Sequence, residues 1–199
     1  MKRTIFTAIL AIVAIVAQGQ KLKMNDPSIS DYLPLLKEQG YIAYSFDTKK
    51  FKGKQAVPII KEYTDGKETN SNVINFQVSI LIGKKLIIGF SPAATDSTAN
   101  FIYTFGEMSG FGGRLYLKPV SDPNESVPPL YMYGSRPFKL VPPFKAGEFI
   151  PLVMYGSWWY DKKFNCTRFC GDNFINPDLT SDILKDIPHY FVLGLIIKE

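Results

Sequence analysis

The sequence has few of the residues from which metal sites and many hydrolytic sites are built. It contains one histidine and two cysteines in 199 residues. A protein zinc site usually takes three or four ligands, so His and Cys alone cannot supply one here. The HExxH metalloprotease motif needs two histidines and is excluded as well. We therefore expect neither a metal nor a cofactor.

Long apolar runs are also scarce, and the longest lies near the start of the chain. Lys2 and Arg3 precede an almost wholly apolar segment, Thr4–Ala17, which Gln18-Gly19 follows. A basic start, an apolar segment and small residues before a cleavage point are typical of a secretory signal peptide. The apolar segment is shorter than the ~20 residues of a membrane span. We expect residues 1–19 to be a signal peptide and 20–199 one β-rich domain, exported to the periplasm or the exterior without a transmembrane segment.

The charge balance is weakly basic. The 23 Lys and Arg against 18 Asp and Glu give +5, and loss of Lys2 and Arg3 leaves 21 − 18 = +3. That charge is too small to indicate nucleic acid as a partner. Four lysines cluster around Phe51, at Lys49, Lys50, Lys52 and Lys54. They are typical of a solvated loop, and the alternative is a patch for an acidic glycan or lipid surface.

The expected signal peptide (the leader, residues 1–19) and one tripeptide resemble segments of known exported proteins. The Lys-Arg start, the Ala-Gln-Gly-Gln end of the leader and Asp96-Ser97-Thr98 resemble exported, uncharacterised proteins of Bacteroidales-type Gram-negative bacteria and their short O-glycosylation sequon. The resemblance implies a compartment and a modification of Ser97 or Thr98. It implies no activity and identifies no specific family.

The rest of the pattern indicates strands joined by turns. Strands are expected at 41–46, 74–82, 86–90, 100–105, 114–118, 130–133, 138–141, 149–155 and 190–197, and short helices at 28–39 and from Asn176 to before Pro188. Regular helices do not alternate with the strands, which argues against a parallel sheet. The sequence predicts a mainly β single domain, an antiparallel sandwich or barrel with two short helices, with α+β as the alternative.

Some of these predictions are detailed enough to be tested by a structure. Ile74–Ile82 alternates apolar and polar residues, and a hairpin with 86–90 would set Ile82 opposite Leu86. Gly110, Gly112 and Gly113 predict a flexible turn. Tyr190–Ile197 is apolar on both sides and is therefore expected in the centre of a sheet.

An internal repeat links two segments 22 positions apart. Residues 129–135, Pro-Leu-Tyr-Met-Tyr-Gly-Ser, recur with one change at 151–157. One interpretation is two similar strands that end in the same Gly-Ser turn. The other is a pair of strands that present Tyr133 and Tyr155 to one ligand surface.

Three consecutive aromatic residues, Trp158-Trp159-Tyr160, follow the second copy. Side chains alternate along an extended chain, so the three rings cannot all point inward. Aromatic rings with a polar edge suit contact with a glycan or a protein. We take Trp158, Trp159, Tyr160, Tyr133 and Tyr155 as the candidate ligand-binding residues, with an aromatic cluster over a sheet end as the structural alternative.

Cys166 and Cys170 are the only thiols in the chain. In an oxidising compartment they are expected to form a structural disulfide, provided that the segment between them curls. A redox-active pair is the alternative, although the spacing is not the CxxC of thioredoxin-like sites.

The sequence shows no nucleophile elbow, phosphate loop or dinucleotide fingerprint. Glu107, Glu148 and Asp161 follow or precede expected strands, and two carboxylates about 5–10 Å apart could hydrolyse glycosides. His189 starts the last strand, where a structural role is the plainer interpretation. Asp178, Asp182 and Asp186 would form one stripe on the second helix, typical of a solvated face.

These observations favour an exported binding or interaction module whose partner is a glycan or a cell-surface protein. A carboxylate-dependent hydrolase of extracellular polymers is one alternative, and a structural or assembly subunit is another. The catalytic residues of the hydrolase alternative and the oligomeric state stay open.

Overall fold

A computed structural model describes residues 24, 26–74, 79–91, 97–106, 110–120 and 131–198. The chain divides into two compact units, Met1–Leu35 and Leu36–Glu199, and every described strand belongs to the second. None of the described helices is long and apolar enough to cross a membrane.

Helix α2 (Ile29–Glu38) confirms the first predicted helix. Near its start the Ser28 backbone N–H donates to the Asp31 carboxylate over 2.6 Å, which satisfies a donor that a helix end leaves unpaired. The chain leaves the helix through Gly40 at φ +82°, a left-handed conformation that glycine adopts without strain. No residue of α2 is buried.

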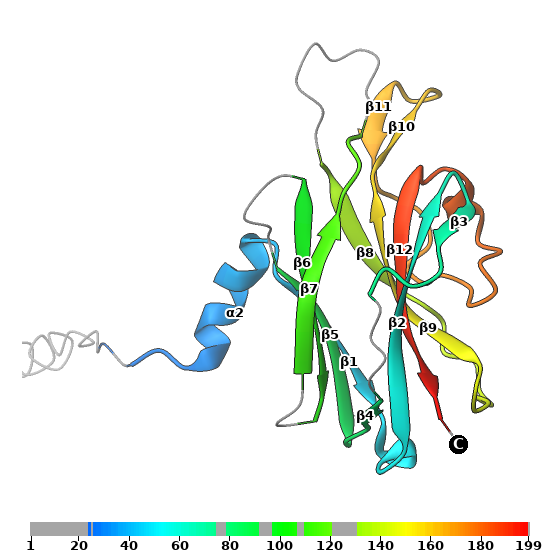
Figure 1. Ribbon diagram of the computed structural model, residues 1–199. Coiled ribbons are helices and arrows are strands. Elements are labelled where there is room, and N and C mark those ends of the chain that lie inside the picture. Colours follow the sequence, from blue (N-terminus) through cyan, green and yellow to red (C-terminus); the bar gives the residue numbers. More distant parts are fainter. Residues whose placement is uncertain are drawn as a thin grey trace, which may run out of the picture. The chain divides into compact units, whose positions relative to one another are not determined.

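The first sheet has four antiparallel strands in the order β1-β5-β6-β7 (Figure 1). Their bounds are β1 Ile42–Asp47, β5 Lys85–Ser91, β6 Thr98–Phe105 and β7 Gly110–Tyr116. Alternation along β6 buries Phe101, Tyr103 and Phe105 on one face, as the sequence predicts.

The second sheet follows the order β3-β2-β12-β9-β8, and a short sixth strand, β4, pairs with β2. Its strands are β2 Gln55–Thr64, β3 Lys67–Asn70, β4 Ile80–Leu81, β8 Tyr133–Pro137, β9 Phe149–Ser157 and β12 His189–Ile197. Because β12 lies between β2 and β9, the prediction of a central final strand is confirmed. A separate hairpin joins β10 (Trp159–Asp161) to β11 (Cys166–Arg168).

The two sheets pack face to face. The Tyr103 hydroxyl on β6 donates to the Gly194 carbonyl on β12 over 3.2 Å, and the Phe90 ring of β5 stacks on Tyr155 of β9 with centroids 4.6 Å apart. The main core draws buried side chains from both sheets. The mainly β antiparallel prediction is therefore confirmed, and the form is a sandwich.

A second core covers the other face of the second sheet. Tyr190 and Val192 of β12 and Met154 of β9 pack with Ile183 and Ile187, which lie in and after a 3₁₀ turn, η2 (Asp182–Lys185). This second layer is why β12 is apolar on both faces: each face has a core of its own.

The predicted hairpin from 74–82 to 86–90 is wrong. Ile80–Leu81 pairs with Gln55 and Ala56 in the second sheet, whereas β5 pairs with β1 and β6 in the first. The chain changes sheets across Ile82–Lys84, and a period-two pattern does not reveal which strand will be the neighbour. Residues 75–78 of the predicted strand lie outside the described residues, and Ile74 is in a bend.

Two further local predictions need correction. The glycines expected to form a turn lie inside β7. Two of these positions require glycine, because a Cβ on Gly110 or Gly112 would come within 2.8 or 2.6 Å of a β6 carbonyl. The second helix is reduced to η2, since Leu179 is left-handed at φ +60° and Asp178 binds the Thr180 backbone. The aspartate stripe on a helix therefore does not form.

The strand expected at 138–141 is also absent. Phe138 makes an isolated parallel bridge to Ile175, and residues 139–141 form no strand. Tyr131 and Met132 precede β8 without joining it, and Leu130 lies outside the described residues.

Candidate functional site

A basic hollow lies at the end of the sandwich where the 48–54 segment meets the crossing between the sheets. Thr48 donates through its backbone N–H to the Lys84 carbonyl (3.1 Å) and through its hydroxyl to the Gly83 carbonyl (3.0 Å). The Gly53 N–H donates to the Ile82 carbonyl over 3.0 Å. These bonds fix together two segments that lie about thirty residues apart in the sequence.

Glycines allow this local structure. Gly53 has φ +85°, which closes the turn after η1 (Lys49–Phe51). Gly83 lies against the end of β6, where a Cβ would be 2.9 Å from the Phe105 carbonyl. The chain can therefore cross between the sheets close beside β6.

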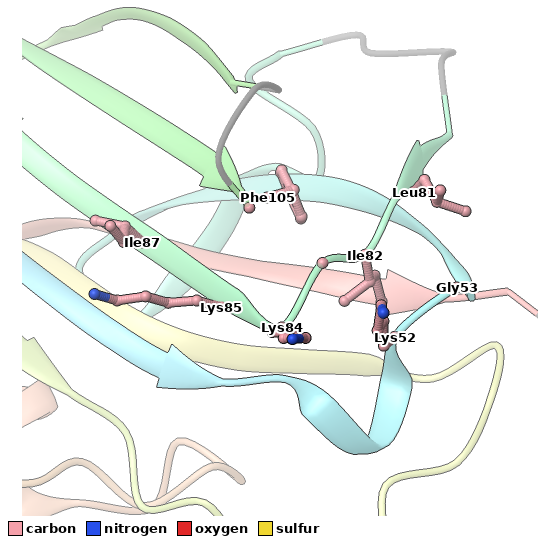
Figure 2. Close-up of a pocket in the computed structure, with 10 residues that line it drawn as sticks. Lys52, Gly53, Leu81, Ile82, Lys84, Lys85, Ile87 and Phe105 are labelled. Carbon is pink, nitrogen blue, oxygen red and sulfur yellow. The ribbon is translucent and has the colours of Figure 1, made fainter.

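The hollow has a volume of about 910 Å³ and is open to solvent. Figure 2 shows three lysines around the turn that joins Leu81 to β5, with apolar side chains beside them. The charged and aliphatic side chains that line the hollow are those of Lys52, Lys84, Lys85, Leu81, Ile82 and Ile87. Leu81 is 63% exposed, so the hollow offers a ligand both charge and an apolar surface.

The charge of the hollow has one sign. Among the described residues no acidic side chain lines it, and no described carboxylate pairs with Lys52, Lys84 or Lys85. The neighbouring Asp47 carboxylate forms a salt bridge with Lys49, whose Nζ lies 3.3 Å from its Oδ2. Clustered like charges repel one another, and a bound anion would relieve that repulsion.

The sequence pattern reveals one of the three lysines of this cluster. It shows Lys52 among the lysines around Phe51, but not that Lys84 and Lys85 lie beside it. The signal that could have found them is Gly83-Lys84-Lys85 itself, read as a crossing between sheets and not as a hairpin turn.

The aromatic candidates lie elsewhere, on and beside the β10–β11 hairpin. Trp159 is only 6% exposed, whereas Trp158 and Tyr160 are half-buried. Both tryptophan rings pack on Phe169, with centroids 6.3 and 6.2 Å from it. The Tyr160 hydroxyl donates to the Asn165 side chain over 2.5 Å. Each ring thus has a contact within the chain.

Phe169 is the centre of this aromatic cluster, and the sequence analysis did not single it out. The Arg136 guanidinium lies 4.4 Å from the centre of its ring and also donates to the carbonyls of Gly171 and Asp172. Gly134 makes room for Phe169, because a Cβ there would lie 2.5 Å from the ring. The arrangement holds the 169–172 loop on the outer face of the second sheet.

Tyr133 and Tyr155 are brought together, but between the sheets. Their rings stack with centroids 5.5 Å apart, and both pack against the main core. The two Tyr-Gly-Ser copies pair with each other: Tyr133 lies opposite Ser157, and Gly134 opposite Gly156. Both copies are therefore paired strand segments, so the interpretation that Gly-Ser forms turns is wrong.

His189 takes part in a buried polar network between strands. Its Nε2 lies 2.9 Å from the Glu62 carboxylate, and its Nδ1 lies 2.5 Å from the Tyr133 hydroxyl. The backbone N–H of Lys118 donates to that same hydroxyl over 2.9 Å. Burial lowers the pKa of His189, and Glu62 opposes this effect. In the neutral ring Nε2–H donates to Glu62 while Nδ1 accepts from Tyr133, so both nitrogens are occupied.

Cys166 and Cys170 are not bonded, which corrects the disulfide prediction. Cys166 begins β11 and pairs with Asp161, so the chain after it runs extended through Arg168. Extended residues advance about 3.3 Å each, whereas a disulfide needs Cα atoms within about 7 Å. The segment does not curl, so both thiols stay free and exposed.

Of the carboxylates proposed for hydrolysis, the two that the structure describes, Glu148 and Asp161, do not form a pair. Glu148 lies before β9 and contacts Lys145 at 3.4 Å, whereas Asp161 lies beyond the other end of β9 and pairs with Arg168. The nine residues of β9 alone span roughly 30 Å, far more than the separation of a catalytic pair. Glu107 and Asp96 lie outside the described residues, and modification of Ser97 or Thr98 stays a prediction.

By fold and site, the described chain is an antiparallel β-sandwich with a basic hollow at one end. Residues 11–199 match the family described as DUF5041, a domain of unknown function, and the chain belongs to that family. Comparison with curated proteins and with solved structures gives no match.

Proposed function

We propose that this protein is an exported, non-catalytic binding module that takes an acidic glycan in the basic hollow. The observation that carries the proposal is the concentration of Lys52, Lys84 and Lys85 at an open cavity whose described lining includes no carboxylate. The leader of residues 1–19 supports export to the periplasm or the exterior, where acidic polysaccharides are the available polyanions.

The shape of the site favours a glycan over a lipid surface. A bilayer is met by projecting loops, whereas these lysines surround a concave hollow. A sugar ring has apolar C–H faces as well as charged groups, so Leu81 and Ile87 would contact the ring while the lysines contact carboxylate or sulfate. The open form of the hollow suits a polymer chain that enters and leaves it.

The test compares binding of polygalacturonate with binding of neutral dextran. The triple variant Lys52→Gln/Lys84→Gln/Lys85→Gln should weaken polygalacturonate binding about tenfold, since each exposed ion pair contributes about 0.2–1 kcal/mol. A matched control, Lys67→Gln/Lys162→Gln/Lys163→Gln, removes the same charge from exposed lysines elsewhere and should bind like the wild type. Equal loss in both triple variants would show that only net charge matters and would refute the site.

Two further measurements separate this proposal from its competitors. Trp158 and Tyr160 are the half-buried aromatic candidates beside the β10–β11 hairpin, so Trp158→Ala and Tyr160→Ala should leave binding unchanged if the hollow is the site. Loss of binding in these variants alone would move the site to the aromatic cluster. Retention on anionic vesicles without binding of polygalacturonate would replace the glycan by a lipid surface.

A further inference from the structure

Strand β7 lies at one edge of the first sheet. In the order β1-β5-β6-β7 it is the outermost strand, and among the described residues it pairs with β6 alone. The pairing is continuous from Thr98 opposite Tyr116 to Thr104 opposite Gly110, without a register shift. An unpaired row of N–H and C=O groups along a regular edge is a template for another strand.

One hydrogen bond shows which backbone N–H and C=O groups of β7 face β6 and which face away from it. The Leu117 N–H donates to the Ser97 carbonyl over 2.8 Å, and these two residues lie directly opposite each other in the register. In an antiparallel ladder, bonded and non-bonded pairs alternate. Every second residue of β7 therefore bonds to β6, and the backbone groups of the others point outward: Gly110, Gly112, Arg114 and Tyr116.

The strand itself lacks most of the features with which proteins usually block edge pairing, and its one charged side chain is Arg114. β7 contains no proline, lysine, carboxylate or bulge. At the edge of the second sheet, β3 carries Lys67 and Glu68 and has a register shift against β2. The opposite edge strand, β8, ends in Pro137. The contrast suggests that β7 is kept open for a partner strand.

The sequence of β7 is complementary to itself. In an antiparallel pairing centred on Gly113, large side chains face small ones: Tyr116 lies opposite Gly110 of a second copy, and Arg114 opposite Gly112. The same register keeps Phe111 and Leu115, which lie on the core side, next to each other. It also sets the outward backbone groups of one strand opposite those of the other, and no like charges lie directly opposite each other across it.

We propose that two copies of this protein associate by antiparallel pairing of β7 with β7 around a two-fold axis at Gly113. A symmetric pair uses the same surface on both copies, and the pairing covers the β7 edge of each. The association depends on backbone hydrogen bonds, whereas the proposed glycan site depends on lysines. It therefore goes beyond the proposed function and stands independently of it.

The test is the mass of the purified protein in solution, measured by sedimentation velocity over a range of concentrations. The wild type should shift from one copy to two as concentration rises. Arg114→Pro removes an outward N–H that β6 does not use, so this variant should stay monomeric. The control, Arg114→Ala, changes the side chain but keeps the N–H, and should dimerise like the wild type.

Amide hydrogen exchange on the wild-type protein supplies a test that requires no variant. The amides of Gly112 and Arg114 should gain protection as concentration rises, whereas those of Gly113 and Leu115 should be protected at every concentration. A protein that stays monomeric, or a dimer that persists in a folded Arg114→Pro variant, would overturn the proposal.

Discussion

Gly194→Ala should lower the stability of the fold more than the same change at any other glycine compared in the described structure. This glycine lies in β12, where the pairing with β9 shifts register between Leu193 and Gly194. A Cβ at this position would lie 2.2 Å from the Ile150 carbonyl oxygen and 2.7 Å from the Phe149 ring. Real Cβ contacts essentially never fall below 3.0 Å, so Gly194→Ala requires a shift of at least 3.0 − 2.2 = 0.8 Å. The atom in the way belongs to the backbone of a paired strand, which cannot rotate aside.

The cost follows from that geometry. Forcing extra atoms into a packed core usually costs about 1–3 kcal/mol, and backbone displacement places this variant at about 3 kcal/mol or above. For a domain of this size, that lowers the melting temperature by roughly 6–12 °C. The Gly194 carbonyl also accepts the buried hydrogen bond from Tyr103, so a shifted β12 would strain that contact as well.

Gly89→Ala is the matched control. Gly89 also lies in a central strand, but the one close contact of its Cβ would be the Ile102 side chain at 3.0 Å, with the Ile42 carbonyl oxygen at an ordinary 3.5 Å. That side chain is 48% exposed and can rotate away, so the expected loss is below ~1 kcal/mol. Both variants would be followed by urea and thermal unfolding, with circular dichroism as the signal. Equal stability of the two variants would refute the claim that backbone contact decides the cost.

Three further changes test other parts of the structure. Tyr103→Phe should lower the free energy of unfolding by about 1–1.5 kcal/mol in urea titrations, because the buried Gly194 carbonyl loses its donor. Arg136→Lys should speed proteolysis at the 169–172 loop, since a single ammonium cannot reproduce the guanidinium contacts with Phe169 and the Asp172 carbonyl; unchanged cleavage would contradict this role. Burial lowers the pKa of His189, so its contribution to stability is present above about pH 6.5 and is lost as pH falls below that value. His189→Asn should flatten this part of the stability profile, and an unaltered profile would exclude His189 as its source.

Local patterns predict several strands of this protein, those whose burial pattern is visible in the sequence, but not β2 or β3. Phe101, Tyr103 and Phe105 alternate with less buried residues, and β6 buries that same face. Tyr190–Ile197 is apolar throughout, and β12 is covered by a core on each side. The mainly β class and the central place of β12 follow from these patterns.

The pairing of the strands could not be predicted in the same way. Ile80–Leu81 is apolar enough for either sheet, and only the tertiary structure places it against β2. The candidate site depends on that same choice, because the crossing at Gly83 brings Lys84 and Lys85 to Lys52. The composition of the lysine loop indicates a basic surface, whereas the hollow is a product of the change of sheet.

Glycine shows most clearly why local propensity is an incomplete guide for this chain. Its usual meaning in a sequence is a turn, yet Gly112, Gly134 and Gly194 all lie inside paired strands. Each is there because a neighbour, either a carbonyl or an aromatic ring, occupies the space of its Cβ. In β7 the consequence extends beyond the fold. The glycines that let β7 lie close to β6 also leave room opposite Tyr116 and Arg114 of a second copy, and the proposed pairing of two copies uses that room.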